Sequence, residues 1–390
     1  MKIALICPDG LSTLLFCKGI IRSLKTVNNA RIYIFCESNE YKIHLEEFGV
    51  EVVDISYPRW MSIAGDLKYF LTIRSFLKLK KIELVFNFSS KSNIYGALAA
   101  KSLKIKKIYC HVVGLGGAFQ KLPGLYAFIK KFIFIFLYKN AFKFSHGVWF
   151  TNSRDLEEFT KRNIVDSKKT ILTKNYLDVS EYQLNLVDSQ RKENAANICK
   201  LRMDETMVVM VARMIWPKGI REFVEASKIV FSELPKTKFV LVAPLESGSS
   251  QAVPESYVKS AEDSANFKWV GFQEDVKAIY SLAELAVLPT FYREGGYPRG
   301  LLEPMAMGKP IITTDSDDCR GAVEEGKNGF LVPINDPVSL AEKIIQILKD
   351  PHLRESFGSY GRMKAFRDFH ENEIIPNALS ELGIPIHKDI

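Results

Sequence analysis

Two glutamates, Glu294 and Glu303, bracket a short stretch that contains two glycines, a proline and an arginine. The stretch follows a strand-like run, ELAVLPT, and leads into helix-like residues and then a second strand-like run, PIITT. Adjacent glycines, Gly295 and Gly296, can adopt positive φ, which lets backbone N–H groups converge on an anion. Carboxylates repel phosphate but accept hydrogen bonds from sugar hydroxyls. The spacing therefore predicts a site for a ligand that carries both phosphate and hydroxyl groups.

A second loop, VARMIWPKG, places Arg213 and Lys218 after another strand-like run. Two cations in a strand-to-helix loop suit a diphosphate, because guanidinium and ammonium groups both bind phosphate oxygens. Pro298 suits the start of the helix that follows the glycines, and the dipole of that helix adds to the attraction. Two ordinary surface cations are the simpler interpretation of this loop alone, but the glutamate–glycine stretch favours an anion site.

The elements that must position these loops alternate between strand-like and helix-like runs along most of the chain. Short β-rich runs include KIALIC, RIYIFC, LVFNF, KIYCHVV and GVWFTN in the first half, and MVVMVAR, KFVLVAP, FKWVGF and GFLVP in the second. This alternation predicts an α/β fold with two doubly wound, Rossmann-like parallel sheets. Ligands bind such sheets at the carboxyl ends of the strands, so we expect two domains that face a cleft.

The pattern lapses into a polar, weakly periodic stretch near residues 178–200, which marks the expected domain boundary. We expect a first domain over residues 1–180 and a second over residues 200–365. A C-terminal helix at 366–390 is expected to return to the first domain. A chain of 390 residues is long enough for two such cores.

The net charge of +8 is unevenly placed, because residues 84–154 contain ten lysines and one arginine but no acid. Inside this stretch, Lys130, Lys131, Lys139 and Lys143 flank seven apolar residues at 132–138, too few to span a bilayer. The composition favours an interfacial helix on an anionic membrane surface. A buried core helix with lysine ends is the alternative. No nucleic-acid-binding module is recognisable, so no nucleic-acid partner is expected.

The six cysteines form no C-x-x-C pair, which argues against a zinc site and a disulfide framework. Reduced thiols in a cytoplasm are the plain interpretation. The start of the chain lacks the features of a signal peptide.

The glutamate pair with GGYPRGLLEPMAMGKPIITTD resembles the donor-site signature of glycosyltransferase family 4, whose members are retaining enzymes of the GT-B architecture. VARMIWPKG resembles the arginine–lysine pair of that family. In the first half, FCKGIIRSL, SKSNIYGALAAK and VVGLGGAF resemble a narrower group, the bacterial transferases that extend undecaprenyl-diphosphate-linked glycans.

The resemblance implies a role for each matched residue. Arg213 and Lys218 would neutralise the departing diphosphate, and Glu294 would hold the donor sugar; we take these three as catalytic. Glu303 would hold the ribose. The other donor-binding candidates are Gly295, Gly296, Tyr297, Pro298 and Arg299. These cations and backbone amides can meet the charge of the leaving group, so no metal or other cofactor is expected. The run Asp315–Asp317 resembles metal-binding aspartates of another glycosyltransferase architecture, and we interpret it as coincidence.

The sequence departs from the family pattern in three places. One residue more than usual separates the two glutamates, and Gly296 looks like the insertion. Val113 stands where many members carry a histidine, with His111 two residues earlier on the same face of the strand. Cys17 stands where relatives in the narrower group often have arginine, which leaves Lys18 as the nearest cation.

The acceptor side is defined by weaker signals. Arg59, Lys91 and Asn93 are candidates for holding the diphosphate of a polyprenyl-diphosphate-linked saccharide, and His111 is a further candidate at that site. Surface solvation or helix capping explains the first three equally well.

The sequence thus predicts a retaining glycosyltransferase that moves a hexose or N-acetylhexosamine from a UDP-sugar to a polyprenyl-diphosphate-linked saccharide. Such an enzyme would act in surface-glycan biosynthesis, peripherally at the cytoplasmic face of the cell membrane. Two alternatives share the fold: an inactive GT-B scaffold subunit, and a GT-B epimerase or phosphorylase.

Overall fold

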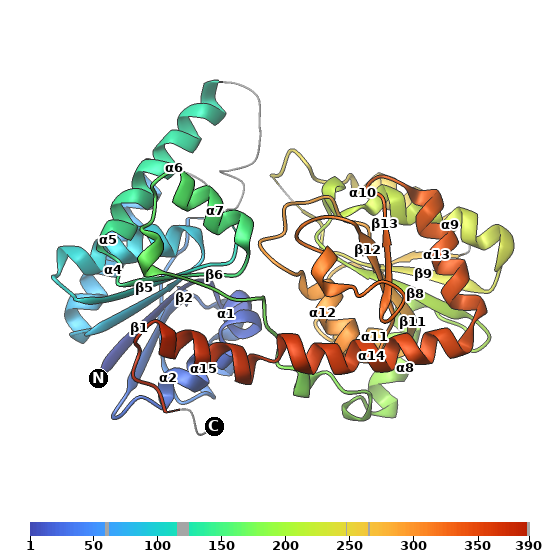
Figure 1. The fold of residues 1–390 in the computed structure, drawn as a ribbon, viewed down its shortest axis with the longest axis horizontal. Helices are drawn as coiled ribbons and strands as arrows, with labels where there is room; N and C mark the ends of the chain where they lie inside the picture. The colour runs from blue at the N-terminus through green and yellow to red at the C-terminus, as the bar shows by residue number, and fades with distance from the viewer. Residues whose placement is uncertain (59–61, 115–124, 247, 264–265, 388–390) are drawn as a thin grey trace. The chain divides into compact units, whose positions relative to one another are not determined.

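The computed structural model describes residues 1–58, 62–114, 125–246, 248–263 and 266–387. The chain forms two compact units, one made of Met1–Tyr176 with Glu371–Ile390, the other of Leu177–His370. Each unit contains one parallel β-sheet flanked by helices (Figure 1). The predicted α/β class with two doubly wound sheets is therefore confirmed.

The first unit is built on a seven-stranded sheet with the order β3-β2-β1-β4-β5-β6-β7. Its strands are β1 (Lys2–Asp9), β2 (Arg31–Glu37), β3 (Glu51–Asp54), β4 (Leu84–Phe88), β5 (Lys107–Val112), β6 (Gly147–Phe150) and β7 (Thr170–Leu172). Central strands are buried on both faces, as parallel strands between two helical layers require. Strand β7 was missed, since three residues are too few to show a periodic pattern.

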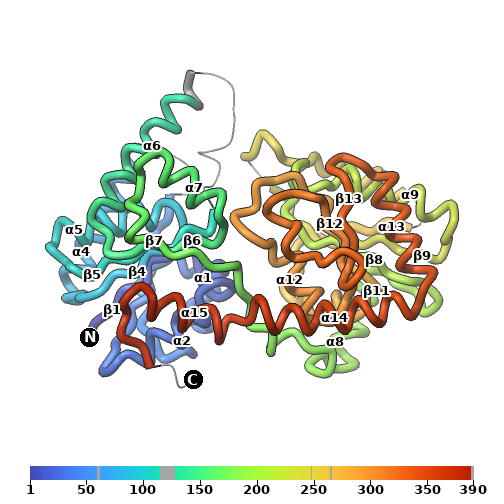
Figure 2. Tube along the Cα trace, in the orientation of Figure 1, coloured from blue at the N-terminus to red at the C-terminus, as the bar shows by residue number. Residues whose placement is uncertain are grey.

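Helices cover both faces of this sheet. One face packs against α4 (Ile63–Lys80), α5 (Ala97–Ser102), α6 (Leu125–Phe144) and α7 (Ser153–Lys161), and the other against α2 (Lys18–Lys25) and α15 (Glu371–Glu381). Two short helices, α1 (Gly10–Phe16) and α3 (Lys42–Glu46), complete the unit, and a π-helical turn at Ser92–Gly96 precedes α5. The N-terminal half of α6 projects beyond its neighbours, which is clearest in the Cα trace (Figure 2).

The second unit has a six-stranded sheet with the order β10-β9-β8-β11-β12-β13. Its strands are β8 (Thr206–Val211), β9 (Thr237–Val242), β10 (Phe267–Trp269), β11 (Ala283–Leu288), β12 (Ile311–Thr314) and β13 (Gly329–Val332). Its helices are α8 (Ser189–Cys199), α9 (Ile220–Glu233), α10 (Glu255–Glu262), α11 (Val276–Leu282), α12 (Arg299–Ala306), α13 (Pro337–Lys349) and α14 (Pro351–Phe369).

The domain boundaries differ from those expected. The boundary expected near residues 178–200 lies at 176–177, because that stretch contains α8, whose Ala195 and Cys199 are buried in the core of the second unit. The C-terminal region is not one helix: α14 ends at Phe369 in that same core, and His370 is extended, with φ −70° and ψ 123°. Helix α15 then packs Ile375 and Leu379 into the first unit. The chain therefore passes between the units at 176–177 and at 370–371.

The strand order of the second unit reverses between β8 and β11. At such a switch point the loops that follow the two strands diverge and leave a crevice for a ligand. These two loops are the ones that carry Arg213 with Lys218 and Glu294 with its glycines. Among the helices of the described residues, none has the length and apolarity needed to cross a membrane.

Candidate active site

The loops after β8 and β11 approach each other closely at Gly219. This residue has φ +84°, and a Cβ built on it would lie 2.2 Å from the carbonyl oxygen of Pro289. A larger residue would clash and would also be strained at this φ. Glycine therefore allows the backbone to bring Lys218 next to the stretch that carries Glu294.

Lys218 and Glu294 form a buried ion pair. The Lys218 Nζ lies 2.6 Å from each carboxylate oxygen of Glu294, and the two side chains are only 9% and 8% exposed. The fully buried Thr290 donates its hydroxyl hydrogen towards Glu294 Oε1 at 2.9 Å and the Pro217 carbonyl oxygen at 3.1 Å. Lys218, which is predicted to bind the diphosphate, and Glu294, which is predicted to bind the sugar, are thus held next to each other.

Tyr292 lies beside both predicted cations. The guanidinium carbon of Arg213 is 4.9 Å from the centroid of the Tyr292 ring, and Lys218 Nζ is 5.3 Å from it. Both distances are within the range of cation–π attraction. Two of the three predicted catalytic residues therefore lie against one aromatic ring, and the third, Glu294, pairs with Lys218. The sequence analysis missed Tyr292; its only signal is an aromatic residue two positions before Glu294.

The glycine turn has the predicted conformation, with φ +30° at Gly295 and +119° at Gly296. Tyr297 is turned towards the core of the unit, where its ring packs edge-on against Phe369 at 5.3 Å between centroids. Pro298 is the N-cap of α12, so the helix begins directly after it, at Arg299. The backbone N–H groups of Gly295 and Gly296 can therefore bind an anion, while the Tyr297 ring anchors the loop to the core of the unit.

Glu303 lies in α12 and is a member of a buried triad. Its Oε1 accepts hydrogen bonds from Arg299 Nε at 2.8 Å and from the Tyr182 hydroxyl at 3.1 Å. The Tyr182 oxygen in turn accepts one from Arg299 Nη2 at 2.8 Å. Burial raises the pKa of Tyr182, and the nearby Glu303 raises it further, which keeps the phenol protonated as a donor. The triad orients Glu303, while its predicted contact with a ribose stays a prediction.

Lys91 is not an accessible cation on the acceptor side. It is 5% exposed, and its Nζ lies 2.5 Å from Oδ1 of Asp66, which is itself buried. Burial lowers the pKa of Lys91, although the hydrogen bond to Asp66 opposes this effect. Lys91 thus has a carboxylate partner within the protein, as Lys218 does, and its contact with an acceptor diphosphate stays a prediction. Arg59 lies outside the described residues.

Asn93 and His111 are structural rather than accessible. Both are fully buried; the Asn93 amide donates to the His111 carbonyl at 2.9 Å and its Oδ1 accepts from the His111 N–H at 3.2 Å. The His111 ring stacks on Trp149 at 4.0 Å, and its nitrogens have no hydrogen-bond partner among the described residues. Burial lowers the pKa of His111 to about 3. Both predictions of acceptor contact are therefore corrected: these residues join β5 to the segment after β4.

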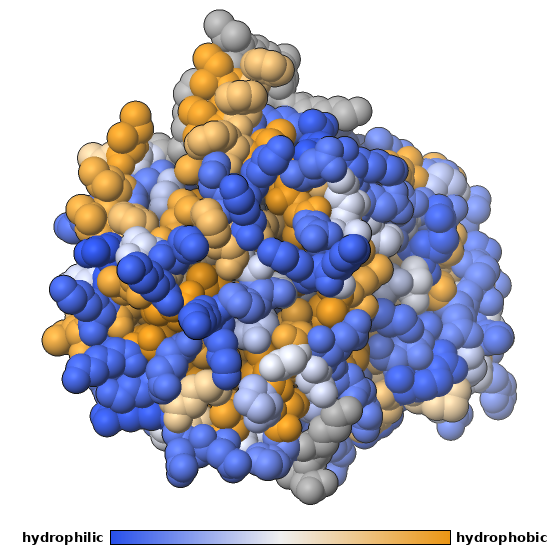
Figure 3. Space-filling model, turned by 60° about the vertical axis from the view of Figure 1, so that its left-hand side comes forward, coloured by the Kyte–Doolittle hydropathy of each residue, from blue (hydrophilic) through white to orange (hydrophobic). Residues whose placement is uncertain are grey.

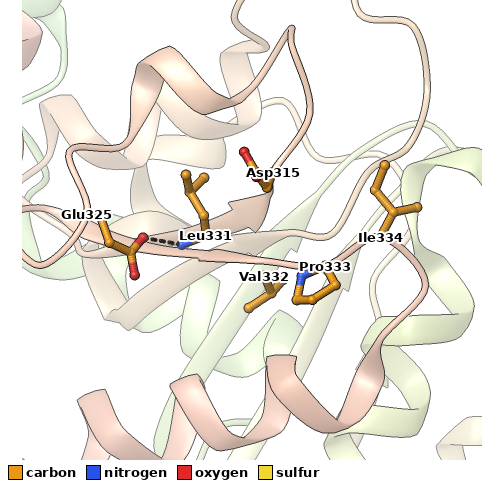
Figure 4. A pocket seen from close by; sticks show the side chains of 6 residues that line it. All are labelled: Asp315, Glu325, Leu331, Val332, Pro333 and Ile334. Carbon is orange, nitrogen blue, oxygen red and sulfur yellow. Dashed lines mark hydrogen bonds between the residues drawn. The ribbon is translucent and has the colours of Figure 1, made fainter.

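A pocket of about 500 Å³ lies at the carboxyl ends of β12 and β13 (Figure 4). It is lined by Asp315, Glu325, Leu331, Val332, Pro333 and Ile334, and none of the predicted site residues lines it. Asp315 and Asp317 both pair with Arg320. The two carboxylates are thus paired with an arginine side chain of the same turn.

Comparison with known proteins points to one class. The family model for glycosyl transferases group 1 matches residues 191–364. The chain is 28% identical to N,N'-diacetylbacillosaminyl-diphospho-undecaprenol alpha-1,3-N-acetylgalactosaminyltransferase of Campylobacter jejuni, over 96% of each chain. It is 24% identical to UDP-Gal:alpha-D-GlcNAc-diphosphoundecaprenol alpha-1,3-galactosyltransferase of Escherichia coli, over 75% of this chain and 73% of that protein.

Solved structures share the fold across the whole chain. Anabaena HepE, determined in complex with UDP and glucose, matches with a TM-score of 0.76 at 17% identity, over 99% of this chain and 100% of HepE. WaaG, a glycosyltransferase involved in lipopolysaccharide biosynthesis, matches with a TM-score of 0.72 at 14% identity, over 98% and 99% of the two chains.

The fold is that of the GT-B glycosyltransferases, and the chain is a glycosyltransferase. Residues 191–364, which match the family model for glycosyl transferases group 1, carry all the predicted donor-site residues. The resemblance to enzymes that act on undecaprenyl-diphosphate-linked glycans, inferred from the sequence, is confirmed.

Proposed function

We propose that this protein is a retaining glycosyltransferase that moves a hexose or N-acetylhexosamine from a UDP-sugar to a polyprenyl-diphosphate-linked saccharide. The observation that carries the proposal lies in the two loops at the switch point of the second sheet: Arg213 and Lys218 both contact Tyr292, and Glu294 pairs with Lys218. The relatives from Campylobacter jejuni and Escherichia coli support the acceptor class, since both names contain a diphospho-undecaprenol saccharide.

The chemistry follows from the charges of these side chains. Arg213 and Lys218 stabilise the negative charge that develops on the leaving diphosphate, as fixed cations do in a preorganised site. Glu294 accepts hydrogen bonds from donor-sugar hydroxyls and offsets positive charge on the sugar. The acceptor hydroxyl attacks from the face that the diphosphate leaves, and a phosphate oxygen takes its proton. That course retains the anomeric configuration and requires no nucleophile from the protein.

The acceptor lipid places the reaction at a membrane, and α6 supplies a matching surface. Phe128, Phe132 and Phe136 lie along one exposed face of the helix and are 69%, 64% and 59% exposed. Figure 3 shows apolar side chains gathered over the projecting part of α6. The opposite face packs Tyr138 and Phe142 into the core, as expected for a core helix, and the exposed face supports the membrane proposal.

Helix α4 carries a second exposed apolar row in the same helical layer. Ile63, Leu67 and Leu71 recur every four residues and are all exposed. Helices α4 and α6 both pack on the same face of the sheet of the first unit. We propose that these two rows and the lysines of α6 bind the inner face of the cell membrane.

Release of UDP tests the proposal most simply. The protein is incubated with a panel of UDP-sugars, with and without a short polyprenyl-diphosphate-linked saccharide. A glycosyltransferase releases UDP at a rate that depends on the acceptor. Acceptor-independent release would indicate a hydrolase or an epimerase that leaks, and no release with any pair would indicate a scaffold subunit.

A further inference from the structure

The turn between β12 and β13 contains three aspartates in different surroundings. Asp315 and Asp317 have exposed side chains, 52% and 71%, and pair with Arg320 on the surface. Asp318 is only 6% exposed, and its Oδ2 accepts a hydrogen bond from the backbone N–H of Glu294 at 2.9 Å. A buried carboxylate is costly unless donors meet it, so this contact is a specific feature of the fold.

The same turn contacts the glycine loop a second time at Gly321. A Cβ built on Gly321 would lie 2.1 Å from the Tyr297 hydroxyl oxygen, so the tyrosine rests directly on the glycine backbone. Only Gly295 and Gly296 lie between these two contacts, and both have positive φ. Because glycine has more conformational freedom than any other residue, the loop relies on its anchors for a single conformation.

We propose that Asp318 is a positioning residue for the transfer reaction. It fixes the backbone of Glu294, which holds the Glu294 carboxylate against Lys218 and Thr290. Asp318 itself contacts neither the donor nor the acceptor in this account. The inference rests on the proposed function where kcat is measured, but the measurement of hydrogen–deuterium exchange does not depend on that function.

Asp318→Ala removes the hydrogen-bond acceptor and should release Glu294 from its place. A displacement of about 1 Å in a reacting group lowers the rate by about 100-fold, so kcat should fall by about 10- to 100-fold. The affinity for UDP, measured by calorimetry, should change by less than about 3-fold, because the side chains of Arg213 and Lys218 are untouched. Asp318→Asn keeps an oxygen that can accept the same bond and should restore most of the activity.

Asp317→Ala is the matched control, since it removes an exposed carboxylate from the same turn. Its kcat and its affinity for UDP should equal those of the wild type. Melting temperatures are measured for all three variants; if Asp318→Ala fails to fold, it is replaced by Asp318→Ser, whose hydroxyl oxygen is one bond too short to accept the same hydrogen bond from the Glu294 amide.

Hydrogen–deuterium exchange gives a measurement that needs no substrate. The peptide spanning Tyr292–Tyr297 should exchange faster in Asp318→Ala than in the wild type and Asp317→Ala, because the Glu294 amide has lost its acceptor. Unchanged exchange in that peptide would overturn the inference even if no substrate were known. Equal loss of turnover in Asp318→Asn and Asp318→Ala, or loss of UDP binding as large as the loss of kcat, would also overturn it. If the peptide exchanges faster in Asp318→Ala, as predicted, but the wild type transfers no sugar, only the proposed function is contradicted.

Discussion

At the scale of single residues, the ion pair between Lys218 and Glu294 decides what each side chain offers to a ligand. The lysine ammonium already contacts both oxygens of a carboxylate. A diphosphate that binds here therefore competes with Glu294 for the same cation. Arg213 is exposed and contacts the same Tyr292 ring. Among the described residues it forms no ion pair with a carboxylate.

The cations should control turnover. Arg213→Ala or Lys218→Ala removes charge stabilisation from the leaving diphosphate, and each should lower kcat by about 100-fold or more. Lys228→Ala, which removes an exposed lysine from the next helix, serves as the control and should keep full activity. Steady-state kinetics with a UDP-sugar measure the effect, and near-normal kcat in both site variants would refute their assignment.

Neutralising Glu294 should separate turnover from nucleotide binding. In Glu294→Gln the side chain keeps its shape but loses the charge that holds Lys218. Turnover should drop by at least about 100-fold, while the affinity for UDP stays equal or rises, because Lys218 no longer has a competing carboxylate. Calorimetry with UDP and single-turnover kinetics give the two values. A variant that loses UDP binding but still transfers sugar would show that the roles of Glu294 and Glu303 are exchanged.

The buried His111 should make the first unit less stable in mild acid. Its pKa is about 3 in the folded protein, against an ordinary value of 6.5. Between these values the unfolded chain binds a proton that the native state does not, so stability falls as pH drops below 6.5. From pH 6.5 to 5 the cost is about 2 kcal/mol.

His111→Phe keeps a ring against Trp149 but cannot titrate, and it supplies the comparison for this effect. Unfolding midpoints in urea are measured between pH 5 and 7.5 for both proteins. The variant should lose less stability than the wild type as the pH falls. Parallel curves would show that His111 is not the source of the pH dependence.

At the scale of elements, the sequence located the strands well because parallel strands between two helical layers are short, continuous apolar runs. The residues at their carboxyl ends could therefore be placed at one edge of a sheet, which is how Arg213, Lys218 and Glu294 were found. The acceptor residues could not be placed in this way. Whether Lys91 is accessible depends on Asp66, and whether His111 is accessible depends on Trp149, and both partners are distant in the sequence.

Helix α6 should bind anionic membranes through both charge and apolar contact. Changing Lys130, Lys131, Lys139 and Lys143 to glutamate should release the protein from anionic vesicles, since each lysine near such a surface contributes about 1 kcal/mol. Salt should weaken the binding of the wild type only in part, because the apolar side chains of the helix do not depend on charge.

A second variant tests the apolar part of that surface. Replacing Phe128, Phe132 and Phe136 with serine should remove the binding that persists at high salt. Leu79→Ser is the control, because Leu79 is 68% exposed at the far end of α4. Co-sedimentation with neutral and anionic vesicles across a salt series measures both effects. Equal binding of the wild type to the two kinds of vesicle, or binding to neither, would contradict the membrane proposal.

At the scale of the whole molecule, we assign the donor site to the second unit and the membrane contact to the first. The second unit holds every predicted donor residue, while the first carries the apolar rows of α4 and α6. Activity on a short, water-soluble acceptor should therefore survive the α6 substitutions, although activity on a long-chain acceptor in vesicles should fall.

The most direct test of the account is the product itself. The wild type and Lys218→Ala are incubated with a UDP-N-acetylhexosamine or UDP-hexose and a synthetic polyprenyl-diphosphate-linked saccharide, and the lipid product is analysed by mass spectrometry and NMR. The account predicts that the wild type adds one sugar residue to the acceptor, that the new linkage keeps the anomeric configuration of the donor, and that Lys218→Ala forms almost no product. Inversion of the anomeric configuration, or failure of every UDP-sugar to extend a lipid-linked acceptor, would contradict it.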